Sequence, residues 1–241
     1  DYNGYNISCN GYSDGGIDLN VAGSVPGYNY LWNTSAVTED ITNLSLATYS
    51  VDITDLNSCT TSTSFTLTEP TPLQTSLIVT DYNGYNISCN GYSDGGIDLV
   101  VSGSVPVYNY LWNTSAVTED ITNLSLATYS VDITDFNSCT TSTSFTLTEP
   151  TPLQTTIVPT IYNGYNISCN GYSDGGIDLS VWGSAPGYTY LWNNSATTED
   201  ITNLPLGTYN VDITDLNSCT TSTSFTLTEP TTLQTTIAAS T

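Results

Sequence analysis

The cysteines are the residues whose type and spacing point most directly to chemistry. Six of them occur as three pairs, each 50 residues apart: Cys9 and Cys59, Cys89 and Cys139, Cys169 and Cys219. An even number at regular spacing is typical of disulfides formed in an oxidising compartment. We expect one disulfide within each pair, which would stabilise its repeat by about 4 kcal/mol in the chain-entropy model. Isolated pairs of thiols without histidine do not make a zinc site.

Carboxylates are the second group that could do chemistry. The chain contains 23 Asp and Glu residues and no Lys, Arg or His, so its formal net charge is −23. Hard oxygen ligands of this kind are what calcium takes. The strand order predicted below places Asp14 and Asp55 at one end of the first repeat, with Asp81 and Glu149 facing the same junction from the second. The hypothesis of a calcium site at the first junction follows.

A simpler interpretation competes with calcium. Asp14 and Asp55 lie in turns, where aspartate commonly accepts hydrogen bonds from its own backbone. At the second junction Ile161 stands where the first has Asp81, which removes one ligand. Under this interpretation the chain requires no cofactor.

The composition also excludes several functions. Catalysis would have to use two carboxylates, as in glycosidases, and the available pairs recur in every copy, which suits architecture better than one active site. We therefore predict that the protein is not an enzyme. Nucleic acid is excluded as a direct partner because phosphate binding needs cationic side chains. No stretch reaches the ~18 apolar residues of a membrane span, so direct membrane insertion is not expected.

The sequence repeats with a period of 80 residues. The motif ISCNGYSDGGIDL begins at Ile7, Ile87 and Ile167, without insertion or deletion inside any copy. A unit of this length is small but can fold alone. The predicted domains are 1–80, 81–160 and 161–241. Because the chain opens in phase with the repeat, we expect it to be part of a longer array.

Short runs of alternating apolar and polar residues indicate β-strands within each repeat, and turn residues separate them. In the first repeat the predicted strands are 4–9, 15–23, 28–33, 38–42, 48–54, 60–68 and 72–79. Seven short strands predict an immunoglobulin-like β-sandwich with Trp32 in its core. The predicted fold is therefore all-β, with three tandem sandwiches.

This strand order supports the predicted disulfide. Cys9 closes the first strand and Cys59 opens the sixth, and these two points meet at one end of an up-and-down sandwich. The linkers between repeats are short, which limits hinge motion. Since an eight-residue strand spans about 27 Å, we expect an elongated, semi-rigid rod of roughly 100 Å or more.

Five motifs extend the comparison beyond single residues: ISCNGYSDGGIDLNVAG, PGYNYLWN, TEDITNL, TYSVDITDLNSC and FTLTEP. Together they resemble the SprB-repeat family over nearly every position of all three copies. Two positions depart from the family pattern. Ser58 precedes the second cysteine where glycine is usual, and Ala47 stands where the third copy keeps Gly207. Both departures lie in turns.

The resemblance implies a very large cell-surface protein of the Bacteroidota, exported by type IX secretion, in a family that includes adhesin filaments of gliding motility. We expect an extracellular location and the role of a stalk that gives reach and stiffness. The alternative is that each repeat is a weak carbohydrate-binding module and tandem copies give avidity. Trp182, an aromatic residue at an outward position, appears in one copy only, which favours the stalk.

The expected partners are neighbouring repeats of the same protein. Self-assembly into filaments is a further hypothesis, because identical repeats can pack side to side or head to tail. The charge of −23 opposes lateral packing unless metal or salt intervenes. Surface glycans or other cells would be reached through parts outside this sequence.

Overall fold

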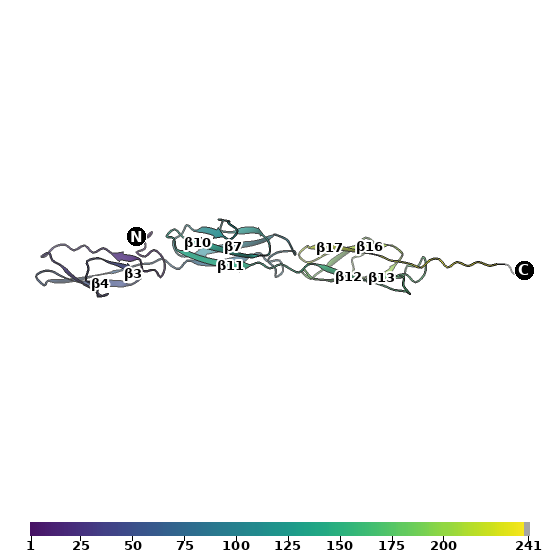
Figure 1. Cartoon of the computed structure of the whole chain (residues 1–241), viewed down its shortest axis with the longest axis horizontal. Helices are drawn as coiled ribbons and strands as arrows, with labels where there is room; N and C mark the ends of the chain where they lie inside the picture. The colour runs from purple at the N-terminus through teal and green to yellow at the C-terminus, as the bar shows by residue number, and fades with distance from the viewer. Residues whose placement is uncertain (239–241) are drawn as a thin grey trace. The chain divides into compact units, whose positions relative to one another are not determined.

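The computed structural model describes residues 1–238. All elements of regular secondary structure in that range are β-strands (Figure 1). The first strands are β1 (Gly15–Ile17), β2 (Asn29–Trp32), β3 (Ile41–Leu44), β4 (Thr48–Thr54) and β5 (Thr60–Thr66). The next are β6 (Gln74–Val79), β7 (Gly95–Ser102), β8 (Asn109–Trp112), β9 (Ile121–Leu124), β10 (Thr128–Thr134) and β11 (Thr140–Thr146). The last are β12 (Gln154–Pro159), β13 (Gly175–Trp182), β14 (Thr189–Trp192), β15 (Ile201–Leu204), β16 (Thr208–Thr214) and β17 (Thr220–Thr226). The described range has no helix that could cross a membrane.

The strands of each repeat form two sheets. One has the order β2-β4-β5, β8-β10-β11 or β14-β16-β17 in successive repeats. The other has the order β6-β7-β9 in the second repeat and β12-β13-β15 in the third, whereas the described part of the first repeat has the two-stranded sheet β1-β3. The predicted all-β fold of tandem repeats is confirmed.

The hydrophobic core lies between the two sheets. In the third repeat Ile177 and Leu179 of β13 pack in one cluster with Trp192 of β14 and Ile213 of β16, and each is at most 2% exposed. Trp32 is 3% exposed in the equivalent cluster of the first repeat. Its predicted role in the core is therefore confirmed.

The seventh predicted strand belongs to the neighbouring repeat. β12 pairs antiparallel with β13, from Gln154 opposite Trp182 to Pro159 opposite Ile177. β6 takes the same place beside β7. The prediction that each 80-residue copy closes its own sandwich is therefore wrong, because a strand from one copy completes the sheet of the next.

The segment before β6 explains why the strand is passed on. Pro70 and Pro72 interrupt the chain between β5 and β6. Each proline fixes its own φ and biases the preceding residue toward extended backbone. The chain therefore runs on toward the next repeat instead of reversing onto its own sheet.

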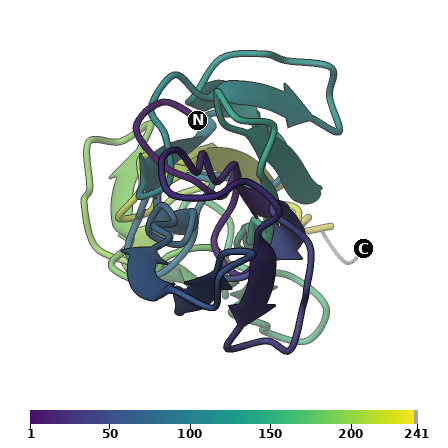
Figure 2. The same cartoon turned by 90° about the vertical axis from the view of Figure 1, so that its left-hand side faces the viewer.

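Residues 4–9, predicted as a strand, form a loop instead. The backbone amides of Asn6 and Ile7 both donate to the carbonyl oxygen of Thr68, at 3.0 and 3.1 Å. These bonds fix the loop just beyond the end of β5, and Ile7 is completely buried there. Figure 2 looks onto the first repeat end-on, with its connecting loops toward the reader.

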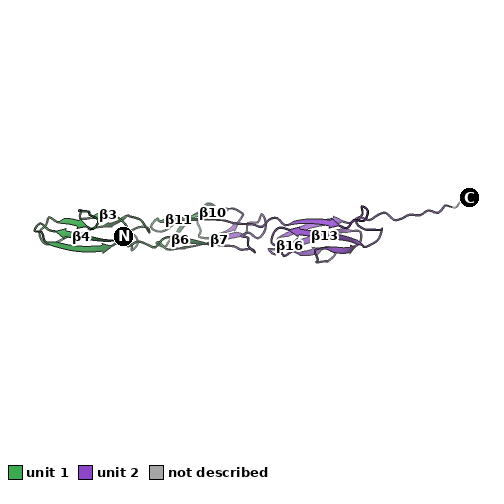
Figure 3. Cartoon of the chain, turned by 90° about the horizontal axis from the view of Figure 1, so that it is seen from below, with its two compact units in different colours: residues 1–78, 97–121, 128–145 green, residues 79–96, 122–127, 146–241 purple. Residues whose placement is uncertain are grey.

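The described chain divides into two compact units (Figure 3). Unit 1 comprises residues 1–78, 97–121 and 128–145, and unit 2 comprises 79–96, 122–127 and 146–241. All of these boundaries except the one after Ile78 fall inside the second repeat, so residues of that repeat belong to both units. Each unit contains one complete junction between neighbouring repeats.

Candidate functional site: disulfide-linked junctions between repeats

The disulfides join neighbouring repeats. Cys9 is bonded to Cys139 and Cys89 to Cys219, with S–S distances of 2.09 and 2.07 Å and a Cα–Cα distance of 5.6 Å in each bond. The partners are 130 residues apart in the sequence. The predicted pairing within each repeat is therefore wrong.

The length of β5 keeps Cys9 away from Cys59. The loop of Cys9 is tied to Thr68, after the strand ends, whereas Cys59 directly precedes Thr60, where the strand begins. A strand of seven residues spans about 24 Å. A disulfide needs a Cα–Cα distance of roughly 4.4–6.8 Å. The prediction failed because it treated 4–9 as a strand that ends beside Cys59.

Two cysteines are left as free, exposed thiols. They are Cys59 in the first repeat and Cys169 in the third. Cys59 is equivalent by the repeat to Cys139, and Cys169 to Cys89. The equivalents of both free cysteines are therefore disulfide-bonded at the internal junctions.

Each junction is built from loops of two repeats. Junction 1, in unit 1, consists of Tyr2, Asn3, Ser8, Cys9, Thr71 and Pro72 of the first repeat and Gly103, Ser104, Asn137 and Cys139 of the second. Junction 2, in unit 2, consists of the residues 80 positions later.

Asn137 joins the two sides of junction 1 through its side-chain amide. Nδ2 donates to the carbonyl oxygens of Ser8 at 3.1 Å and Tyr2 at 3.4 Å, and Oδ1 accepts from Asn3 Nδ2 at 2.6 Å. Asn217 makes the equivalent three bonds in junction 2. An amide side chain supplies the two donors and the acceptor that these contacts use.

The two backbones meet closely where the chain enters β6. The amide of Ser104 donates to the carbonyl oxygen of Thr71 at 3.0 Å. A Cβ atom at Gly103 would lie 2.0 Å from the carbonyl oxygen of Pro72, and Gly103 has a φ of +83°. Glycine tolerates both the positive φ and the close contact. A larger residue at position 103 would push the turn away from Pro72 of the first repeat.

A buried aspartate shapes the loop that carries Cys139. Asp135 is 2% exposed, and its Oδ1 accepts from the amide of Cys139 at 2.7 Å. Its Oδ2 accepts from the amide of Val105 at 3.1 Å and from the hydroxyl of Ser104. The carboxylate therefore holds the second cysteine and the Gly103 turn in one arrangement.

Asp55 shapes the same loop in the first repeat. It accepts from the amides of Asn57 and Cys59, both at 2.8 Å, and from the hydroxyl of Ser24. The hydrogen bond from Ser24, followed by that from the Cys59 amide, lowers the pKa of Asp55 below its ordinary value. The carboxylate is thus engaged by backbone and hydroxyl donors, as the turn interpretation expects.

Two other carboxylates shape the loop that carries Cys9, on the side of junction 1 that belongs to the first repeat. Asp14 Oδ1 accepts from the amide of Ser8 at 3.1 Å. Glu69 accepts from Asn10 Nδ2 and from the amide of Gly11, both at 2.8 Å. These bonds hold the turn on which Cys9 is presented.

The four carboxylates of the predicted calcium site do not form one ligand set. Asp14 and Asp55 lie at opposite ends of β5, which corrects the predicted placement. Asp81 accepts from the amide of Gly84 at 2.7 Å, and Glu149 is bonded within its own repeat. Among residues 1–238 no group of three or more His, Cys, Asp or Glu residues could hold a metal ion. Calcium binding stays a prediction without a contact that supports it.

Sequence reasoning missed Gly103, Ser104 and Asn137. Asparagine stands two positions before the second cysteine in every copy, and Gly-Ser recurs in every copy, beginning at Gly23, Gly103 and Gly183. That recurrence is the signal that could have found them. Ser138, where the family pattern has glycine, has a φ of 69°, so this turn uses the left-handed region that normally favours glycine.

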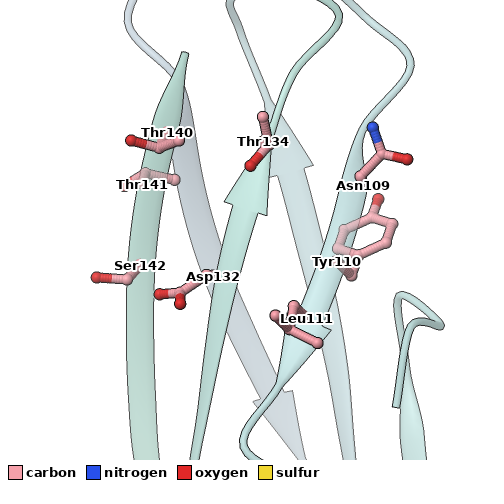
Figure 4. A pocket seen from close by; sticks show the side chains of 8 residues that line it. All are labelled: Asn109, Tyr110, Leu111, Asp132, Thr134, Thr140, Thr141 and Ser142. Atoms are coloured by element: carbon pink, nitrogen blue, oxygen red, sulfur yellow. The ribbon is translucent and has the colours of Figure 1, made fainter. Parts of the chain in front are cut away.

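A shallow depression lies on the sheet of β8, β10 and β11 (Figure 4). Asn109, Leu111, Asp132 and Thr140 are among the residues that line it. The equivalent residues line a depression in the first repeat. Tyr110, also at the depression, is hydrogen-bonded to a glutamate, and burial followed by the charge of that glutamate raises the pKa of Tyr110 to about 12.

Comparisons with solved structures find immunoglobulin domains and the tandem repeats of an adhesion protein. The N-terminal eight Ig domains of Down Syndrome Cell Adhesion Molecule isoform 1.30.30 match 84% of this chain at 10% identity, with a TM-score of 0.43. The chain spans 33% of the length of that structure. A tetra-tandem repeat in the extending region of a large adhesion protein matches 93% of this chain and 72% of its own at 11% identity, with a TM-score of 0.26.

The comparison with sequence families is more specific. No curated protein matches the chain. The family model of the SprB repeat matches three times, over residues 5–37, 85–117 and 163–197. Each match covers the loop of the first cysteine, the strand that follows it and the whole of the strand that carries the tryptophan. The resemblance of the sequence motifs to the SprB repeat is thereby confirmed, with one match in each copy.

Proposed function

We propose that the three repeats form a structural, non-enzymatic stalk within a long extracellular surface adhesin, and that the disulfides staple each repeat to the next. The observation that carries this proposal is the pairing of cysteines across both junctions. The three matches to the SprB repeat support a cell-surface location. Export by type IX secretion and a part in the gliding motility of Bacteroidota are the finer proposals that the family resemblance suggests.

The double connection at each junction suits a part that bears load. Neighbouring repeats are joined once by the main chain and once by a disulfide. In the oxidised chain the shortest covalent path from Cys9 to Cys219 crosses to Cys139, follows the chain back to Cys89 and crosses again. That path contains about 50 residues and extends to about 180 Å, against about 740 Å for the full stretch of about 210 residues. Tension therefore lengthens the stapled chain much less than an unstapled one.

Single-molecule pulling tests this proposal. The chain with Cys59→Ala and Cys169→Ala is held at its two ends, so that only the internal disulfides remain. We expect the oxidised molecule to stop near the shorter length and the same molecule in reductant to reach the longer one. Equal extension in both states would show that the staples do not carry load, and the stalk proposal would then be abandoned.

A carbohydrate-binding function is the second candidate. It is favoured by the depression that recurs at the same place in the first and second repeats. The stalk proposal expects no saturable glycan binding by this chain on a glycan array. Binding that is lost on replacing both Asp52 and Asp132 by alanine, but not on replacing Asp18 and Asp98, would favour the second candidate instead.

A further inference from the structure

Asparagine is followed directly by glycine at six positions, twice in each copy. Because glycine has no Cβ, the backbone nitrogen after such an asparagine approaches the asparagine side chain with little hindrance. All six pairs are followed by tyrosine, so their local sequences are nearly the same. The Tyr-Asn-Gly pairs begin at Asn3, Asn83 and Asn163, and the Cys-Asn-Gly pairs begin at Asn10, Asn90 and Asn170.

One glutamate holds both nitrogen atoms of each Cys-Asn-Gly pair. In the second copy, Asn90 Nδ2 donates to Glu149 Oε1 at 2.9 Å, and the amide of Gly91 donates to Glu149 Oε2 at 2.8 Å. Nδ2 also donates to the carbonyl oxygen of Pro150 at 3.1 Å. The backbone nitrogen and the side-chain amide are therefore held side by side on the two oxygens of one carboxylate.

The same arrangement occurs in the other two copies. Glu69 accepts both hydrogen bonds in the first copy. Glu229 accepts from Asn170 Nδ2 at 2.7 Å and from the amide of Gly171 at 2.8 Å in the third. The asparagine and the glycine are exposed in every copy, so water reaches each of these turns.

The Tyr-Asn-Gly pairs have different surroundings. The amide of Gly84 donates to Asp81 Oδ1 at 2.7 Å. Asn83 Nδ2 donates instead to Asn217, in the next repeat. In the third copy Ile161 stands in the place of Asp81. In this set the backbone nitrogen and the side-chain amide therefore do not share one carboxylate.

We propose that the Cys-Asn-Gly turns are sites of self-catalysed deamidation, in which the glutamate of each copy is the catalytic residue. Glu149 accepts the proton of the Gly91 amide as that nitrogen forms a bond to Asn90 Cγ. The proton passes to Nδ2, the bond between Cγ and Nδ2 breaks, and ammonia leaves. Water then opens the cyclic imide at either of its carbonyl groups, which gives aspartate or isoaspartate. A general base needs to lie within about 2.6–3.2 Å of the atom that gives up the proton, and Glu149 does.

The product changes the turn that presents a junction cysteine. Either product loses the Nδ2 donor that Glu149 and Pro150 accept from, and it places a second carboxylate beside Glu149. Isoaspartate also adds a methylene group to the main chain directly after Cys89, which is bonded to Cys219. The reaction therefore loosens the loop on one side of junction 2. This inference does not rest on the stalk proposal, and failure of the pulling experiment would leave it intact.

Peptide mapping by mass spectrometry tests the proposal on the whole, oxidised chain at neutral pH. Each asparagine is followed over time through the mass gained when its NH2 group is replaced by OH. Residues 6–12, 86–92 and 166–172 have the same sequence, so the three glutamates are changed together. The variant carries Glu69→Gln, Glu149→Gln and Glu229→Gln. We expect the Cys-Asn-Gly pairs to react about tenfold faster or more than the Tyr-Asn-Gly pairs in the unmodified chain, and the variant to lose this difference.

The direction of the change separates catalysis from support of the turn. A glutamate that only braced the turn would slow the reaction, so its replacement would speed deamidation. The matched control carries Asp18→Asn, Asp98→Asn and Asp178→Asn, which remove the same charge from exposed positions, and it should leave every rate unchanged.

The unmodified chain also decides the question without any variant. In guanidinium, with its disulfides intact, the two sets of pairs should react at one rate, and the Cys-Asn-Gly pairs should react more slowly than in the folded chain. Equal rates for the two sets in the folded chain would overturn the inference. Faster deamidation of the Cys-Asn-Gly pairs in the denatured chain, or an unchanged or increased rate in the glutamine variant, would overturn it as well.

Discussion

Removing one inter-repeat disulfide is the sharpest test of the junction. The starting molecule carries Cys59→Ala and Cys169→Ala, which leaves both internal bonds and no free thiol. Adding Cys9→Ala and Cys139→Ala removes the first bond without leaving a reactive sulfur. Because the disulfide restricts the unfolded chain, the added pair lowers the free energy of unfolding while leaving the folded sandwiches in place.

The size of the effect follows from the ring that the bond closes. Cys9 and Cys139 are 130 residues apart, which corresponds to about 5 kcal/mol in the chain-entropy model when both repeats unfold together. If the first repeat unfolds alone, the ring spans only the chain from Cys9 to Gln74, where the second sandwich begins. The same model then gives about 4 kcal/mol.

Guanidinium unfolding of both molecules, with and without reductant, measures this difference. We expect a loss of about 4–5 kcal/mol on adding the pair, and reductant should abolish the first bond's contribution in the starting molecule. Thiol titration of the denatured starting molecule is the control, and it should find no free thiol. Two free thiols would instead indicate pairing within repeats, with Cys9 and Cys219 left over, and would refute the structure of the junction.

Three further predictions concern the parts around the bond. Gly103→Ala should destabilise the chain by about 1–3 kcal/mol more than Gly23→Ala in thermal unfolding. Both glycines have positive φ, but only Gly103 lies against a carbonyl group of the neighbouring repeat. Equal losses of stability would exclude that contact. Leu99→Ala should lower the free energy of unfolding by about 2–5 kcal/mol, and Leu19→Ala should lower it clearly less. The reason is that the first repeat lacks the covering strand in the described structure. A larger loss at Leu19 than at Leu99 in chemical denaturation would contradict this. The lowered pKa of Asp55 contributes stability that is present above the unfolded value of about 3.9 and is lost as pH falls through the folded value. Asp55→Asn should therefore weaken the decline in stability between pH 5 and pH 2, and an unchanged decline would argue against its hydrogen bonds.

Much of the local structure could be predicted from residue patterns. Tyr49, Val51 and Ile53 alternate with polar residues, and all three are buried along β4. Trp32 was predicted in the core and lies there. Asp14 and Asp55 accept backbone hydrogen bonds that hold the cysteine loops, as the turn interpretation expects, while calcium binding stays a prediction.

Residue patterns are enough to establish a tandem, all-β array with cysteines suited to oxidation, because alternation, turn residues and spacing are local properties. Which copy supplies the partner of each cysteine and of each edge strand emerges only from the folded chain. In a repeated sequence a segment and its equivalent 80 residues later are nearly the same, so local pattern cannot tell pairing with Cys59 from pairing with Cys139. The length of β5 excludes pairing with Cys59, because Cys9 and Cys59 lie at its opposite ends. The extended stretch around Pro70 then leads the chain to the next repeat, where β6 pairs with β7.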